Sequence, residues 1–192
     1  MRILIVTHHY LHGYGGGVFA SRGFINALAT LYDDITLICP VCRDRKPEHI
    51  HPGVRIIEVP DRRSVVAKVL DLMRGCFHRF RKVFPEVISR ERFDTVVFDT
   101  SYASGGLVKL ARSQCKNVVT IHHNWQYEYE RDNAEGILRP LRLMTVSKCE
   151  REAVLFSTLN ITLTDQDRES LYREYDPERS CRIVVCPPFE YE

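Results

Sequence analysis

The sequence contains no long apolar run and no strong excess of charge of either sign. None of its 192 residues fall in a run of eighteen or more apolar residues, so no segment has the composition of a membrane-spanning helix. The 27 basic and 25 acidic residues leave a net charge of +2, which argues against a nucleic-acid-binding domain. The first residues lack the pattern of a signal peptide. We therefore expect a cytoplasmic protein that does not bind nucleic acid.

The seven cysteines also lack the pattern of a disulfide framework. An odd number, with several in predicted strands and helices, is typical of buried thiols in a reducing compartment. Cys39 and Cys42 form one CxxC pair near His49 and His51, but these histidines are too close together for a zinc finger and no second CxxC follows. The pair ends a strand, whereas a thioredoxin motif opens a helix. Free thiols are the favoured interpretation, with a zinc site as the weaker alternative.

The beginning of the chain is its most informative stretch. Residues 2–7 are an apolar run that suits a strand buried on both faces. Gly15, Gly16 and Gly17 then precede residues 18–32, whose apolar side chains recur at helical spacing. Backbone amides at the N-terminus of a helix favour an anion such as phosphate. The loop therefore predicts a phosphate site. The alternative is that the glycines only permit a positive φ or close helix packing.

This glycine loop matches neither of two common nucleotide-binding motifs. No Gly-Lys-Ser/Thr follows the glycines, so it is not a Walker A loop. In a dinucleotide fingerprint begun by Gly13 and Gly15 the third glycine would fall at Val18, and no acidic residue ends the second strand. A looser glycine-rich turn remains.

Apolar strands and helical segments alternate along the rest of the chain. Six further strands are predicted at residues 35–39, 54–59, 96–98, 118–121, 160–163 and 182–186. Further helices are predicted at about residues 64–90, 105–112, 137–157 and 165–175. Pro85 is expected to break or kink the first of these. The alternation predicts an α/β fold, a Rossmann-like three-layer sandwich with a mostly parallel sheet, in one domain over residues 1–192.

Unusual polar residues follow several of these strands. Ligands of parallel α/β sheets bind at the carboxyl ends of the strands, which lie along one edge. We expect the glycine loop and these residues to line a cleft at that edge. The candidates are His8, Tyr10, Asp99, Ser101, Tyr102, His122, His123, Asn124 and Thr164.

Four motifs occur in a characteristic order and spacing. They are RILIVTHHY with GGGVFASRGFINALA, then VVTIHHNWQYEYER, LNITLTDQDRESLYREY and RIVVCPPF. Together they resemble the N-terminal domain of family 4 glycosyltransferases. The resemblance implies half of a GT-B fold, whose N-terminal domain mainly receives the acceptor and whose C-terminal domain holds the nucleotide sugar. It also implies that the donor-binding domain is absent from this chain, which alone would be inactive as part of a longer or two-chain enzyme.

The resemblance assigns roles to a few residues. Gly15, Gly16 and Gly17 approach the donor diphosphate with their backbone amides. A histidine at the end of the fifth strand reaches the transferred sugar, and two adjacent histidines are candidates for it. The pair His123-Asn124, followed by YEY, favours His123. The distance from the preceding TI favours His122. Because successive strand residues alternate faces, we expect one of the two in the cleft. A histidine that is only hydrogen-bonded at a strand end is the alternative.

A basic segment spans residues 62–92. Nine basic and three acidic side chains give it a local excess of +6. Basic amphipathic helices attract anionic membranes, and Phe77, Phe80 and Phe84 could rest at the headgroup boundary. Ordinary core packing is an equal alternative. The first interpretation predicts peripheral contact with the inner face of a membrane.

The sequence thus predicts the acceptor-side domain of a retaining glycosyltransferase of polysaccharide biosynthesis. As the resemblance implies, it moves a hexose from a nucleotide sugar to a glycan or lipid-linked acceptor and needs no metal ion or other cofactor. Two alternatives remain. One is a non-catalytic subunit that presents the acceptor, and the other is a different Rossmann-like nucleotide-binding enzyme.

Overall fold

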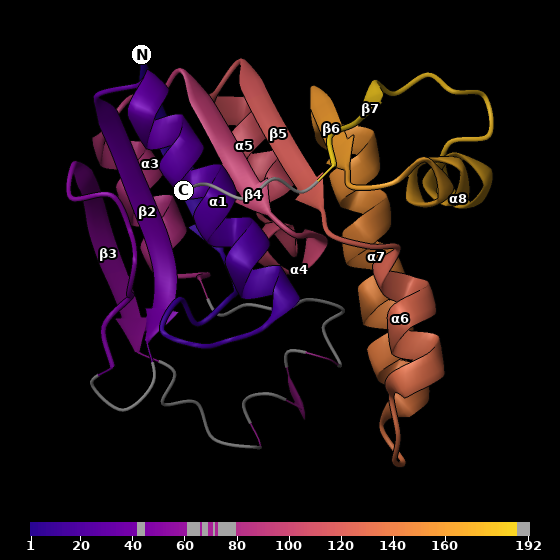
Figure 1. The fold of residues 1–192 in the computed structure, drawn as a ribbon. Coiled ribbons are helices and arrows are strands. Elements are labelled where there is room, and N and C mark those ends of the chain that lie inside the picture. Colours follow the sequence, from indigo (N-terminus) through magenta and orange to yellow (C-terminus); the bar gives the residue numbers. More distant parts are fainter. Residues whose placement is uncertain (42–44, 61–65, 67–68, 71, 73–79, 188–192) are drawn as a thin grey trace.

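A parallel sheet of seven strands organises the described part of the protein (Figure 1). The computed structural model describes residues 1–41, 45–60, 66, 69–70, 72 and 80–187. The strands are β1 (Arg2–Thr7), β2 (Asp34–Val41), β3 (Val54–Pro60), β4 (Thr95–Asp99), β5 (Asn117–His122), β6 (Leu159–Thr162) and β7 (Ile183–Val185). Their spatial order is β3-β2-β1-β4-β5-β6-β7. The order changes direction between β1 and β4, which is where ligands of such sheets bind.

Helices cover both faces of this sheet. They are α1 (Gly16–Leu31), α3 (Val83–Arg90), α4 (Ser101–Ser104), α5 (Val108–Gln114), α6 (Gln126–Asn133), α7 (Arg139–Phe156) and α8 (Asp165–Tyr175). The predicted α/β architecture is confirmed, and every predicted strand is found within two residues of its expected ends. Figure 1 shows α6 and α7 extending beyond the sheet as an antiparallel pair.

The central strands are buried on both faces, as their continuous apolar runs predict. In β1, Leu4 and Val6 join the core beneath α3 and α5, whereas Ile3 and Ile5 join the core beneath α1. The register pairs β1 with β2 on one side and with β4 on the other. The ends of β1 and β4 therefore lie next to each other at the edge where the site forms.

The predicted long helix is described only in part, and its described residues 66, 69, 70 and 72 are helical. Only residues 66, 69, 70, 72 and 80–90 of it are among the described residues. Pro85 lies in the first turn of α3, which begins at Val83, where a backbone N–H has no intrahelical acceptor. The helix continues to Arg90.

The aromatic side chains of this segment pack into the core. Phe80 is 1% exposed and Phe84 is fully buried, with its ring centroid 5.5 Å from that of Phe98. The prediction that these two rings rest at a lipid headgroup boundary is therefore wrong, and the core-packing alternative holds for them. Phe77 lies outside the described residues, as do Arg62, Arg63, Lys68, Arg74 and Arg79. Among the helices that the structure describes, none combines the length and apolarity that crossing a membrane requires.

The described cysteines are free thiols. These are Cys39, Cys115, Cys149, Cys181 and Cys186. Burial, with a smaller contribution from Glu58, raises the pKa of Cys39 to about 12, so this thiol stays protonated. Cys42, the second cysteine of the CxxC pair, lies outside the described residues.

Candidate functional site

A cavity of about 740 Å³ opens where β1, β4 and β5 end beside the N-terminus of α1. His8, His9, Gly16 and Gly17 line one side of it, from the loop after β1 and the first turn of α1. The other side is formed by residues of α4, α6 and α7, which are Tyr102, Gln126, Tyr129, Glu130 and Arg142. The cavity lies at the point where the strand order reverses, as expected for a ligand site in this fold.

Six of the residues predicted from the sequence line this cavity. They are His8, Gly16, Gly17, Tyr102, His123 and Asn124. Asp99 lies directly behind His123 and bonds to it. The sequence therefore located the edge of the sheet and the group of residues that meet there.

The other predicted residues are not among the cavity-lining ones. Gly15 is the N-cap of α1, and the ring of Tyr10 packs edge-on against that of His12, 5.9 Å between centroids. Ser101 is buried, and its carbonyl accepts a hydrogen bond of 2.7 Å from the Ser104 hydroxyl. Thr164 caps α8, because its Oγ1 accepts the N–H of Asp167 at 3.0 Å.

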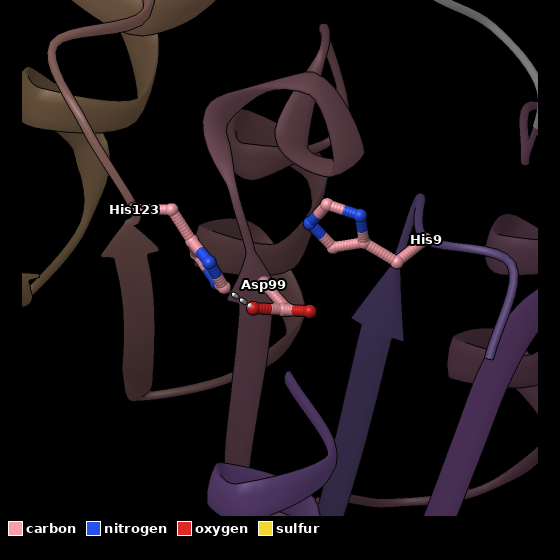
Figure 2. A group of neighbouring side chains, drawn as sticks. All are labelled: His9, Asp99 and His123. Carbon is pink, nitrogen blue, oxygen red and sulfur yellow. Dashed lines mark hydrogen bonds and ion pairs between the residues drawn. The ribbon is translucent and has the colours of Figure 1, made fainter. Parts of the chain in front are cut away.

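An ion pair between His123 and the buried Asp99 lies at the centre of the site (Figure 2). His123 Nε2 is 2.6 Å from Asp99 Oδ1. The second carboxylate oxygen of Asp99 accepts the hydroxyl of Thr7 at 2.6 Å. Because these residues lie at or just after the ends of β5, β4 and β1, the strand register itself brings them together.

His123 and Asp99 shift each other's pKa in opposite directions. Burial acts to lower the pKa of His123, but the Asp99 carboxylate outweighs it, and the net pKa is raised. Burial likewise acts to raise the pKa of Asp99, yet the His123 imidazole reverses this and the net pKa is lowered. Each group thus favours the charged form of its partner. The pairing therefore favours a positive charge on His123 in the cavity wall, beside the buried Asp99.

The two adjacent histidines have different surroundings. His123 lines the cavity, whereas His122 is only 1% exposed and its Nε2 lies 3.1 Å from Asn160 Oδ1 in the core. Burial lowers the pKa of His122 to about 4, only partly offset by the bond to Asn160, so the ring is neutral at pH 7. The structure thus places His123 in the cavity and His122 in the core.

A second polar cluster on the opposite wall was not anticipated from the sequence. Arg142 binds both carboxylate oxygens of the buried Glu130, at 2.8 Å and 2.6 Å. The Tyr102 hydroxyl donates to the same carboxylate, and Gln126 donates to Tyr102 at 3.2 Å. Burial and the nearby Glu130 raise the pKa of Tyr102, which therefore remains a neutral donor. The cluster was missed because the helix that presents Gln126 and Glu130 was not predicted.

Thr100 holds a strained backbone at the edge of the cavity. Its φ of 84° and ψ of 154° lie in a region that non-glycine residues rarely adopt. Two bonds fix it there: its N–H donates to the carbonyl of Ile121 at 2.9 Å, and its hydroxyl lies 2.7 Å from His8 Nδ1. Strain of this kind, about 1–3 kcal/mol, is concentrated at functional sites.

The glycines at the start of α1 differ in the space around them. A Cβ at Gly16 would meet nothing within 4 Å, whereas a Cβ at Gly17 would lie 2.8 Å from Cε1 of His9. Gly17 therefore permits the His9 ring to pack against the helix. Gly16 leaves the helix N-terminus open to a ligand.

The difference between Gly16 and Gly17 predicts different stabilities for their alanine variants. Gly17→Ala is expected to displace the His9 ring and to reduce the free energy of unfolding by about 1–3 kcal/mol through overpacking. Gly16→Ala is expected to leave stability unchanged or slightly raised, because alanine favours a helix more than glycine does. Thermal unfolding, together with the NMR signals of the His9 ring, measures both effects. Equal melting temperatures and unchanged His9 signals in the two variants would contradict the packing described.

Comparison with known proteins identifies the family. The sequence profile of Glycosyltransferase Family 4 matches residues 14–189, which is most of the chain. The chain belongs to glycosyltransferase family 4. The resemblance inferred from the four motifs is thereby confirmed. No curated protein matches the sequence.

Solved structures show the same fold at low sequence identity. Sucrose-phosphate synthase from Thermosynechococcus elongatus matches with a TM-score of 0.71 and 12% identity, over 97% of this chain and 48% of that one. The catalytic domain of starch synthase IV from Arabidopsis thaliana, bound to ADP and acarbose, matches with a TM-score of 0.59 and 12% identity, over 97% and 51%. UDP-N-acetylglucosamine 2-epimerase from Rickettsia bellii matches with a TM-score of 0.51 and 14% identity, over 95% and 44%.

These matches agree with the N-terminal half of a GT-B fold. The family 4 chain spans about half the length of each of these three structures. The likeness to an epimerase also shows that the fold alone does not fix the reaction. The reaction has to be inferred from the residues of the site.

Proposed function

We propose that this chain is the acceptor-side domain of a glycosyltransferase of polysaccharide biosynthesis that moves a hexose from a nucleotide sugar to a glycan or lipid-linked acceptor. One observation carries the proposal: a helix N-terminus with an unobstructed glycine faces the same cavity as the charged His123–Asp99 pair. Family membership supports sugar transfer as the reaction class. A second domain, in the same polypeptide or in a second chain, holds the nucleotide.

Two groups in the cavity suit the donor. Departure of a nucleoside diphosphate builds negative charge on phosphate and positive character on the sugar. The backbone amides of Gly16 and Gly17 are donors at the positive end of α1, where an anion is favoured. His123, charged through Asp99, adds a cation that needs no reorganisation during the reaction.

The opposite wall suits the acceptor. Tyr129 is half exposed and offers an aromatic face, and Gln126 and Arg142 carry N–H donors for sugar hydroxyls. Because Glu130 and Tyr102 are already bonded to one another, the wall is a fixed surface.

Retention of the anomeric configuration, without a covalent glycosyl-enzyme intermediate, is part of the proposal. A double displacement needs a carboxylate that can attack the sugar. Two described carboxylates lie at the cavity, Glu130 in its lining and Asp99 behind His123, and both are engaged: Asp99 with His123 and Thr7, and Glu130 with Arg142 and Tyr102. Transfer within an ion pair, with the departing phosphate receiving the acceptor proton, fits these constraints.

A transfer assay with the complete enzyme tests the proposal. Labelled UDP- and GDP-hexoses are incubated with glycan and lipid-linked acceptors, and the anomeric configuration of the product is read by NMR. Formation of an α-linked product from an α-linked donor is the expected result. Conversion of the nucleotide sugar to an epimer without any acceptor would instead identify an enzyme of the epimerase type. Tight UDP or GDP binding by this chain alone would contradict the division between the two domains.

Peripheral membrane contact through the basic segment remains part of the proposal for a lipid-linked acceptor. Arg81 and Lys82 are exposed just before α3. Each basic side chain near an anionic leaflet contributes about 1 kcal/mol, so changing both to serine is expected to weaken vesicle binding roughly 30-fold. Co-sedimentation with anionic and zwitterionic vesicles measures the change. The matched control is Arg90→Ser, because Arg90 pairs with Glu86 at 2.8 Å, and equal binding by all three proteins would argue for a soluble acceptor.

A further inference from the structure

The helix α6 has little within its own sequence to stabilise it. It is eight residues long, Gln126–Asn133, and isolated helices shorter than about 12 residues are marginal in water. The side chain of its N-cap residue, Trp125, makes no hydrogen bond to the first turn. Yet this helix presents Gln126, Tyr129 and Glu130 to the cavity. Contacts from outside the helix must therefore set the position of that wall.

The first turn of α6 is bound by carboxylates from two other helices. The buried Glu150 of α7 accepts the backbone N–H of Gln126 on Oε1 at 2.8 Å and that of Tyr127 on Oε2 at 3.2 Å. Asp167 of α8 accepts the backbone N–H of Trp125 at 2.8 Å. The first N–H groups of a helix have no acceptor within it, and negative charge is favoured there. The two carboxylates thus cap α6 from a distance.

Burying Glu150 costs free energy, since an acid group in the core loses its hydration. Burial raises its pKa to about 7, although hydrogen bonds from Gln126, Tyr127 and Tyr175 oppose the shift. The Tyr175 hydroxyl donates to Oε2 at 3.0 Å. A proton on Oε2 would be donated to the Tyr175 oxygen, while Oε1 would still accept from Gln126. The side chain therefore anchors α6 in both of its protonation states.

The rest of α6 is held by other residues of α7. Arg142 pairs with Glu130 at 2.6 Å in the middle of the helix. Near its C-terminus, the Arg139 side chain donates to the carbonyl of Arg131 at 2.7 Å. These contacts fix the second half of α6, whereas Glu150 fixes the turn that carries Gln126. Removing the Glu150 carboxylate should therefore disturb one end of the wall and leave the other in place.

We propose that Glu150 is a positioning residue for acceptor recognition, because it holds the first turn of α6 and thereby fixes Gln126 in the cavity wall. The proposal rests on the proposed function, in which this wall receives the acceptor. Glu150 is not itself a cavity-lining residue and acts through the backbone of α6. The donor side of the cavity is formed by the loop after β1 and the start of α1. A change at Glu150 should therefore affect the acceptor and spare the nucleotide sugar.

Glu150→Gln in the complete enzyme tests this role at nearly constant side-chain volume. Glutamine has one oxygen and one NH₂ group, so one of the two backbone N–H groups would face another donor. Amide hydrogen exchange of residues 126–133 is expected to accelerate by about 10- to 100-fold, the effect of losing a hydrogen bond to a charged group. Displacement of the turn is expected to raise KM for the acceptor by about 10-fold, with KM for the nucleotide sugar within about twofold of the wild type.

The matched control is Glu152→Gln, the same change on the same helix. Glu152 pairs with Lys109 of α5 at 2.9 Å and has no hydrogen bond to α6 among the described residues. This variant should leave both the exchange of α6 and the acceptor KM unchanged. Unchanged exchange of α6 in Glu150→Gln would overturn the proposal, because other contacts would then hold the helix. Faster exchange throughout the protein with both KM values altered would also overturn it, since Glu150 would then only support the core.

The two measurements separate this inference from the proposed function. If the wild type transfers sugar and Glu150→Gln exchanges faster in α6 with an unchanged acceptor KM, the glycosyltransferase stands and the acceptor role of Glu150 is lost. If the wild type transfers no sugar to any acceptor, the proposed function fails and the acceptor role fails with it. The exchange rates would then still decide whether Glu150 anchors α6.

Discussion

Alanine in place of His123 is expected to lower the turnover of the complete enzyme by about 10²–10³-fold, the usual loss when one preorganised donor to a developing charge is removed. The reason is the ion pair with Asp99, which favours the charged imidazole and holds its Nε2 2.6 Å from Asp99 Oδ1 in the wall of the cavity. An alanine leaves both the departing phosphate and the buried Asp99 without that cation. Steady-state kinetics with a saturating nucleotide sugar measures the effect.

The neighbouring histidine provides the matched control. His122→Ala removes a buried side chain bonded to Asn160 and should reduce the melting temperature while leaving turnover per folded molecule within a few-fold. Asp99→Asn tests whether Asp99 positions His123: it should reduce turnover and also lower the pKa of His123, followed by NMR, because burial then acts without the opposing carboxylate. Equal and mild kinetic effects of His122→Ala and His123→Ala would indicate that both residues have only a structural role.

The strands could be predicted because their signal is local. Runs such as residues 2–7 and 118–121 are apolar at every position, and a strand covered on both faces requires nothing more. The helix α6 lacked any such signal, since residues 126–133 are polar almost throughout. Its position depends on a distant residue, because Glu150 of α7 accepts the backbone N–H groups of Gln126 and Tyr127 at its first turn. No periodicity within α6 could have shown this.

The site could be predicted only to the level of a sheet edge. The topology places the residues at the ends of β1, β4 and β5 together. It does not determine which of their side chains points into the cavity. His8 was predicted and His9 was not, although both line the cavity and the His9 ring lies 5.4 Å from that of His123 between centroids. The choice depends on Gly17, which has room for the His9 ring, and on the strained Thr100, which bonds to His8. Both are features of the three-dimensional loop and not of residue spacing.

Acidification is expected to destabilise the protein through His122. The pKa of His122 is about 4 in the folded protein and about 6.5 in an unfolded chain. Between pH 4 and 6.5 the unfolded chain therefore binds a proton that the folded chain does not bind. The contribution is fully present above pH 6.5 and is lost as the pH falls toward 4. At full size it is on the order of 3 kcal/mol. The physical cause is burial, because Nδ1 of His122 has no described partner to receive a second N–H.

Denaturant unfolding of the wild type and of His122→Gln between pH 7.5 and 4 isolates this contribution. Glutamine keeps an N–H that reaches toward Asn160 but does not titrate. The difference in free energy of unfolding between the two proteins should therefore narrow by up to about 3 kcal/mol as the pH falls. The comparison is needed because other groups titrate in the same range. Burial raises the pKa of Glu150 to about 7, which contributes with the opposite sign, and the raised pKa of His123 adds stability that is lost only above pH 6.5. These contributions are common to both proteins and cancel in the difference. Parallel stability curves would mean that His122 is protonated in the folded state and that its burial beside Asn160 is incorrectly described.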